Sequence, residues 1–164
     1  MTSIVEQNLP SSLLRALGAY TQTCAHIELH TAVLILEIEK YHRVAPFTKD
    51  VSFPVLRKLT AGNLLKRLKR TLESCQPTPK HRFDELVGRL EEGKDGRDIA
   101  VHGAFYFDQA KQSFRVNFFK KVGDLLVEEQ TEIDSALVVL HQVEADSIYV
   151  EILELIDLVR SGAA

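Results

Sequence analysis

An arginine, a carboxylate and a histidine lie close together near the middle of this chain, where residues 97–103 read RDIAVHG. Histidine titrates near neutral pH and can take up or release a proton during a reaction. Arginine keeps its charge and offers a planar fork to phosphate oxygens. These groups suit cleavage of RNA by its own 2′-hydroxyl, with His102 as base or acid and Arg97 stabilising the phosphorane. We therefore expect a reaction that needs no metal or other cofactor.

The spacing of Arg97 and His102 is a weak signal by itself, because roughly 0.4 such pairs arise by chance in a chain of this composition. A structural role is an alternative. Arg97 could pair with Asp98 or another acid, and His102 could bond a carbonyl at a helix end. In a helix the two residues lie roughly 140° apart, although the long arginine side chain can reach the helix end. Gly103 is expected to end that helix in a left-handed conformation.

One histidine cannot easily serve both the attacking and the leaving oxygen of a phosphodiester. A symmetric dimer that brings two copies of His102 together supplies both groups. The first expected helix offers a surface for such contact. Its apolar positions from Leu13 to Tyr41 recur at steps of four and three, and other apolar residues lie beside them. We therefore expect a homodimer.

Residues 97–103 resemble the signature of HEPN domains, in which an arginine, a polar residue and a histidine follow this spacing. The order of the expected helices is also similar, so the resemblance covers most of the chain in architecture and seven residues in motif. It implies a mainly α fold, a HEPN-like antiparallel helical bundle. It further implies that Arg97 and His102 are catalytic and that Asp98, where the family often has Asn, supports them.

Many HEPN domains are metal-independent endoribonucleases of toxin–antitoxin and other defence systems, with an active site built from two motifs across a dimer. The resemblance thus implies RNA as substrate and an antitoxin protein as a further partner. Two other functions stay open. The chain could be a non-catalytic HEPN-like module that binds RNA, a nucleotide or a protein, or a helical dimer that acts as an adaptor.

Charge is unevenly spread along the chain, although the net charge is only −3. Residues 57–82 contain eight basic residues and one acid, whereas residues 123–160 contain ten acids and one basic residue. The basic part could hold an RNA backbone without reading its bases. Its candidate RNA-binding residues are Lys66, Arg67, Lys69, Arg70 and Arg82. The alternative is two solvated helix faces of opposite sign.

Other possible sites give weaker signals. His26 and His30 stand one helical turn apart but lack an evident third metal ligand. Cys24 and Cys75 form no CxxC pair and read as reduced thiols of a cytoplasmic protein. The longest apolar run is far too short to cross a bilayer, so we expect no membrane contact.

The expected elements form a single domain over residues 1–164. A first helix begins near Leu13 and ends before Pro46, and a second begins at Pro54. In the second helix, Gly62 either weakens the middle or marks a break near Thr60. A third helix ends at the motif, interrupted by Gly93 and Gly96. A β-hairpin insertion follows over about residues 104–120, because apolar side chains alternate there.

The Phe-rich hairpin could stack RNA bases, although such alternation more often marks a core. Leu125 to Val127 could add a short third strand. The last helix is expected to begin at a capping box that starts with Thr131. Its expected buried residues are Leu137, Leu140, Ile148, Ile152, Leu155 and Val159.

Overall fold

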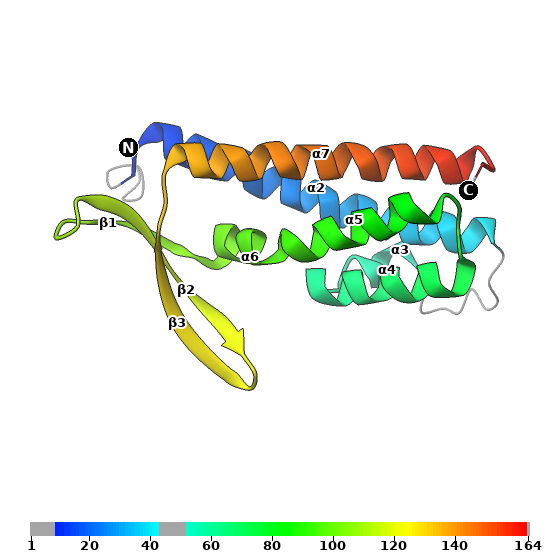
Figure 1. Ribbon diagram of the computed structural model, residues 1–164, viewed down its shortest axis with the longest axis horizontal. Coiled ribbons are helices and arrows are strands. Elements are labelled where there is room, and N and C mark those ends of the chain that lie inside the picture. Colours follow the sequence, from blue (N-terminus) through cyan, green and yellow to red (C-terminus); the bar gives the residue numbers. More distant parts are fainter. Residues whose placement is uncertain (1–8, 43–51, 164) are drawn as a thin grey trace. The chain divides into compact units, whose positions relative to one another are not determined.

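The computed structural model describes residues 9–42 and 52–163, which form helices and one antiparallel sheet (Figure 1). The chain is mainly helical, as expected. Pro46, the predicted end of the first helix, lies outside the described residues.

The contacts within the chain group it into two compact units. Unit 1 comprises Met1–Gln22 and Asp95–Glu144, and unit 2 comprises Thr23–Lys94 and Ala145–Ala164. The first and last helices each contribute residues to both units. The predicted motif belongs to unit 1, and the predicted basic residues belong to unit 2.

Helix α2 (Ser11–Tyr41) contains the predicted apolar seam, which is buried from Leu13 through Ile38. Tyr41, the last seam position, is 44% exposed and lies outside the core. Beside the seam, Ala32 and Ile35 are fully buried within unit 2. In that unit the apolar stripe of α2 is therefore wide and covered by the chain's own residues.

Helix α7 (Ser135–Arg160) begins later than its predicted capping box. The side chain of Asp134 accepts a hydrogen bond from the backbone N–H of Leu137 at 2.7 Å, so Asp134 caps the helix. Thr131 lies in a β-strand instead, and its predicted capping role is wrong. The four predicted core residues from Ile148 to Val159 are buried, but Leu137 and Leu140 are 41% and 68% exposed.

Within unit 2, α2 and α7 run parallel to each other. Thr23 donates to Asp146 at 3.0 Å near one end of the pair. At the other end Arg160 donates to Glu37, also at 3.0 Å. The two contacts join residues with the same separation in sequence, which only parallel helices allow. The expected antiparallel arrangement is therefore wrong for this pair of helices.

Helices α3 (Phe53–Leu56), α4 (Ala61–Cys75) and α5 (Lys80–Glu92) complete unit 2. The predicted break near Thr60 is confirmed, because the Thr60 side chain accepts from the Asn63 N–H and caps α4. Gln76 ends α4 with φ +48°, and α5 begins after a cis Thr78–Pro79 bond. Their buried faces include Leu64, Leu68, Phe83, Leu86 and Leu90.

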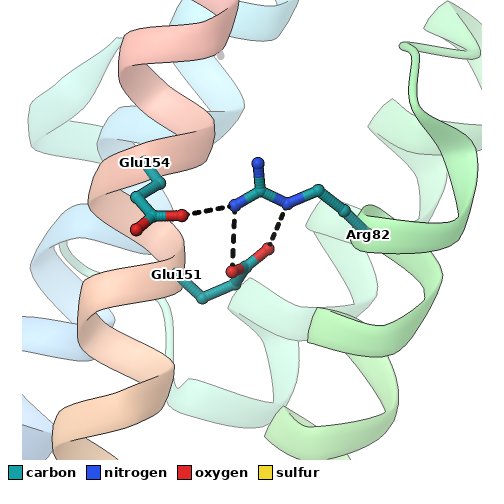
Figure 2. Close-up of polar contacts among 3 residues, drawn as sticks. All are labelled: Arg82, Glu151 and Glu154. Atoms are coloured by element: carbon teal, nitrogen blue, oxygen red, sulfur yellow. Dashed lines mark hydrogen bonds and ion pairs between the residues drawn. The ribbon is translucent and has the colours of Figure 1, made fainter.

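Arg82 on α5 is bound by two carboxylates of α7 (Figure 2). Its Nε and Nη2 donate to the two oxygens of Glu151 at 2.9 and 3.0 Å, and Nη2 also donates to Glu154 at 2.6 Å. The hydrogen bond to Glu151 makes the largest contribution to raising the pKa of Arg82 above its ordinary value, and the bond to Glu154 adds to it. The side chains of Arg82 and Glu151 are only 29% and 23% exposed, whereas that of Glu154 is 59% exposed. The bidentate bond to Glu151 is therefore the stronger link between α5 and α7.

We predict that Glu151→Gln lowers the free energy of unfolding by about 1–2 kcal/mol, because it removes the charge facing a half-buried guanidinium. The control is Asp84→Asn, which removes the same charge from the exposed Lys80–Asp84 pair. That change should stay within about 0.5 kcal/mol of the native chain. Urea unfolding followed by circular dichroism measures both. Equal losses in the two variants would contradict this account of the cluster.

The sheet consists of β1 (Ala104–Asp108), β2 (Ser113–Val122) and β3 (Leu125–Glu132), paired in that order and antiparallel throughout. The predicted hairpin corresponds to β1 and β2. The third strand is much longer than the predicted segment from Leu125 to Val127. Of the alternating apolar residues only Val116, at the middle of β2, is buried, so the core interpretation holds for this residue and not for the phenylalanines around it.

Two turns set the register of the sheet. After β1, the side chain of Asp108 accepts from the N–H groups of Ala110 and Lys111 at 3.0 and 3.2 Å. Gln112 completes this turn with φ +52°. Between β2 and β3, Gly123 adopts φ +63° in a two-residue connection. A Gly-Asp pair between the apolar residues Val122 and Leu125 is the sequence signal for this second turn.

Candidate active site at the end of helix α6

The motif lies on a short helix of its own, α6 (Lys94–His102), rather than at the end of the third helix. Gly93 caps α5 and separates the two helices, so the predicted interruption at Gly93 is confirmed. At the start of α6, Asp95 accepts a hydrogen bond from Lys120 of β2 at 2.9 Å. This hydrogen bond, helped by the charge of Asp95, raises the pKa of Lys120. The motif helix is thereby held against the sheet within unit 1.

The two faces of α6 have different surroundings. Gly96, Ile99 and Ala100 line a cavity of unit 1, whereas Asp98, Val101 and His102 are exposed. An ideal Cβ at Gly96 would lie 3.1 Å from the hydroxyl oxygen of Tyr20. Gly96 therefore lies inside α6 as a close-packing residue and does not interrupt it.

Gly103 ends α6 by a tight contact and not by a left-handed turn. Its φ is not positive, so the predicted left-handed conformation is wrong. Its N–H donates to the carbonyl of Ile99 at 2.8 Å. An ideal Cβ at Gly103 would overlap Cγ2 of Val116 and would lie 2.5 Å from the Ile99 carbonyl oxygen. Only glycine fits between the last turn of α6 and the sheet.

Within the motif, Arg97 and Asp98 form an ion pair, with Nη2 and Oδ1 separated by 3.8 Å. The Arg97 side chain is only 12% exposed, whereas that of Asp98 is 51% exposed. His102 occupies the last turn of α6 and is exposed. Unit 1 thus presents a histidine to solvent and holds the arginine of the same helix largely shielded.

The candidate RNA-binding residues differ in how much of their charge is already compensated. Arg67 donates to Glu39 at 2.6 Å, Lys69 pairs with Glu91, and Arg82 binds the two carboxylates described above. Lys66 and Arg70 are exposed, and neither has an ion pair within the described part of the chain. Of the predicted basic surface, these two residues keep their charge most available to a phosphate.

Glu39 is a buried carboxylate that the sequence reading did not single out. It is 7% exposed and accepts hydrogen bonds from Arg67 and from Thr71, each at 2.6 Å. Glu39 stands four residues after the apolar Ile35, and this position on the apolar face of a helix was the available signal. Burial raises the pKa of the nearby Cys75 thiol, Glu39 raises it further, and Arg67 opposes both.

His26 and His30 take part in ring contacts within unit 2. The rings of both histidines lie against Tyr149, at centroid distances of 5.6 and 5.1 Å. Nδ1 of His30 also lies 2.9 Å from the carbonyl oxygen of His26. Across the described residues, no group of three or more His, Cys, Asp or Glu side chains has the arrangement of a metal site.

Searches of family models, of curated proteins and of solved structures find no match to this chain. The HEPN resemblance therefore stays a prediction that depends on residues 97–103 and on the order of the helices. In the described ranges, no helix has both the length and the hydropathy needed to cross a membrane.

We predict that Gly103→Ala destabilises unit 1 by about 1–3 kcal/mol, because the added carbon overlaps a backbone oxygen that cannot rotate away. Gly88→Ala on α5 is the matched control, since a Cβ there meets nothing within 4 Å. The control should gain about 0.5–1 kcal/mol from the better helix propensity of alanine. Thermal unfolding of both variants tests the difference. A Gly103→Ala variant as stable as the native chain would show that the contact is not tight.

Proposed function

We propose that this protein is a metal-independent endoribonuclease of the HEPN type, acting as a toxin or defence effector. The observation that carries the proposal is the exposed His102 in the last turn of α6, five residues after Arg97. The nearby Asp98 supports the arginine through its ion pair. An antitoxin protein is the partner that this function calls for.

In the proposed reaction the 2′-oxygen of RNA attacks the adjacent phosphorus, and the bond from phosphorus to the 5′-oxygen breaks. One His102 accepts the 2′-hydroxyl proton, and the His102 of a second copy donates a proton to the leaving 5′-oxygen. Arg97 stabilises the negative charge of the phosphorane. One His102 must be neutral to accept a proton while the other must be protonated to donate one, and a homodimer supplies both histidines.

The shielding of Arg97 adds a requirement to this mechanism. A carboxylate 3.8 Å away already faces the guanidinium, so a phosphate must replace Asp98 as its partner. Asp98 is half-exposed and can turn toward solvent at little cost. A phosphorane carries more negative charge than a carboxylate. Arg97 therefore binds the phosphorane in the transition state more strongly than it binds Asp98 in the resting protein.

A second candidate function follows from the same shielding. If Asp98 stays paired with Arg97, the motif has a structural role. The chain then acts as a non-catalytic HEPN-like module that binds RNA, a nucleotide or a protein. The exposed fraction of the Arg97 side chain, 12%, favours this candidate. A cleavage assay tests catalysis, and the salt dependence of RNA binding tests the binding function.

We predict that the purified protein cleaves mixed RNA in the presence of EDTA and that His102→Ala lowers the rate by about 10²–10⁴-fold. Arg97→Lys should also lose activity, because lysine keeps the charge but loses the planar fork. His26→Ala is the control, since His26 is an exposed histidine of unit 2. Its rate should match that of the native chain. An unchanged rate in a folded His102→Ala variant would rule out the catalytic assignment.

We predict that the double variant Lys66→Gln, Arg70→Gln weakens RNA binding and reduces the slope of log K against log salt concentration by about 1–2. The reason is that these exposed side chains release counterions when they meet phosphates. Lys111→Gln, in the exposed turn after β1, is the matched control and should leave the slope unchanged. Fluorescence anisotropy with a labelled RNA over a salt series gives the slopes. Identical slopes for all three proteins would exclude α4 from the RNA interface.

A further inference from the structure

A cavity of about 230 Å³ lies beside the motif helix in unit 1. Its walls come from α2, α6, β1, β2 and the first turns of α7, with further residues from the end of β3. On the α6 side it is bounded by Gly96, Ile99 and Ala100, and Phe105 and Val116 of the sheet also line it. We call this space the α6 cavity.

The α6 cavity explains why the motif helix is poorly buried. None of the nine residues of α6 is buried, although the helix turns an apolar face inward. Protein interiors normally leave few voids larger than a water molecule. Ile99 and Ala100 therefore face space that no side chain of unit 1 fills, and a bound molecule would supply the missing contacts.

The lining chemistry defines the class of molecule. Most wall residues are apolar, and such cavities take up apolar molecules in place of water. An apolar cavity of about 150 Å³ holds a single benzene ring, so the larger α6 cavity suits a bicyclic ring. Its polar members are Tyr20, Thr131, Glu132 and His141.

These polar residues give the cavity a preferred orientation for its ligand. The rings of Tyr20 and His141 have their centroids 6.0 Å apart and their planes inclined by 30°, and they give the cavity an aromatic side. Thr131 and Glu132 also line the cavity, and both residue types carry oxygens that accept hydrogen bonds. A flat ring system with one N–H or O–H donor fits both features.

We propose that the α6 cavity is a binding site for a small bicyclic aromatic molecule with one hydrogen-bond donor, of the indole type. The ligand stacks beside Tyr20 and His141, packs on Ile99 and Ala100, and donates its proton to an oxygen of the β3 end. Because Ile99 and Ala100 lie in the last turn of α6, the bound ring steadies the segment that carries His102. Binding itself does not depend on any RNA cleavage.

The test is a titration of the full chain with 5-fluoroindole, followed by ¹⁹F NMR, together with thermal unfolding followed by circular dichroism. We expect a saturable change in the fluorine signal and a rise in Tm of about 3–6 °C at ten times the Kd. 2-Fluoronaphthalene, which lacks the donor, should bind at least fivefold more weakly. Equal affinity of the two probes would overturn the donor assignment.

Ala100→Leu fills the cavity and should weaken 5-fluoroindole binding at least tenfold without lowering Tm. Ala25→Leu is the matched control, because Ala25 is exposed on α2 in unit 2, and it should bind like the native chain. Should Ala100→Leu fail to fold, Leu17→Phe fills the same space from α2. The site is refuted if the native chain shows no saturable signal up to the solubility limit. It is also refuted if a folded cavity-filling variant binds as well as the native chain.

Discussion

The close contact at Gly103 is the constraint on which the arrangement of the motif depends. Hydrogen at this position lets the last turn of α6 lie directly against Val116, the buried centre of the sheet. The Gly103 N–H closes the helix on Ile99, and His102 is thereby fixed at the exposed edge of the same turn. At the other end of α6, the Lys120–Asp95 ion pair joins the helix to the same strand. A short helix with no buried residue thus contacts the same strand near both of its ends.

Electrostatics divide the charged residues into those that stabilise the fold and those that remain available to a ligand. Glu39, buried in unit 2, engages Arg67 and Thr71, and Glu151 engages Arg82. Arg67 and Arg82, which the sequence predicts to bind RNA, are therefore already paired with carboxylates of the chain. Lys66 and Arg70 remain exposed on α4. The same division applies to the motif, in which Asp98 faces Arg97 while His102 points to solvent.

Helix α2 and the break at Thr60 were predictable from the sequence, because periodicity and capping are local signals. The core of α7 from Ile148 to Val159 was predictable for the same reason. The third strand was only partly predicted, since its signal lay in the Gly123 turn rather than in its mostly polar strand residues. The exposure of Leu137 and Leu140 could not be predicted, because it depends on which neighbours the fold provides. The role of Gly103 was misjudged because close approach to Val116 is a tertiary contact that leaves no local pattern.

The proposed function depends on attack by the 2′-hydroxyl of RNA, and one substrate comparison tests this directly. An RNA oligonucleotide and its fully 2′-O-methylated counterpart are incubated with the protein in EDTA, and the product ends are identified by mass spectrometry. The account predicts that only the unmodified RNA is cut, and that its products carry 2′,3′-cyclic phosphate and 5′-hydroxyl ends. Cleavage of the methylated RNA, or products with 3′-hydroxyl ends, would contradict it.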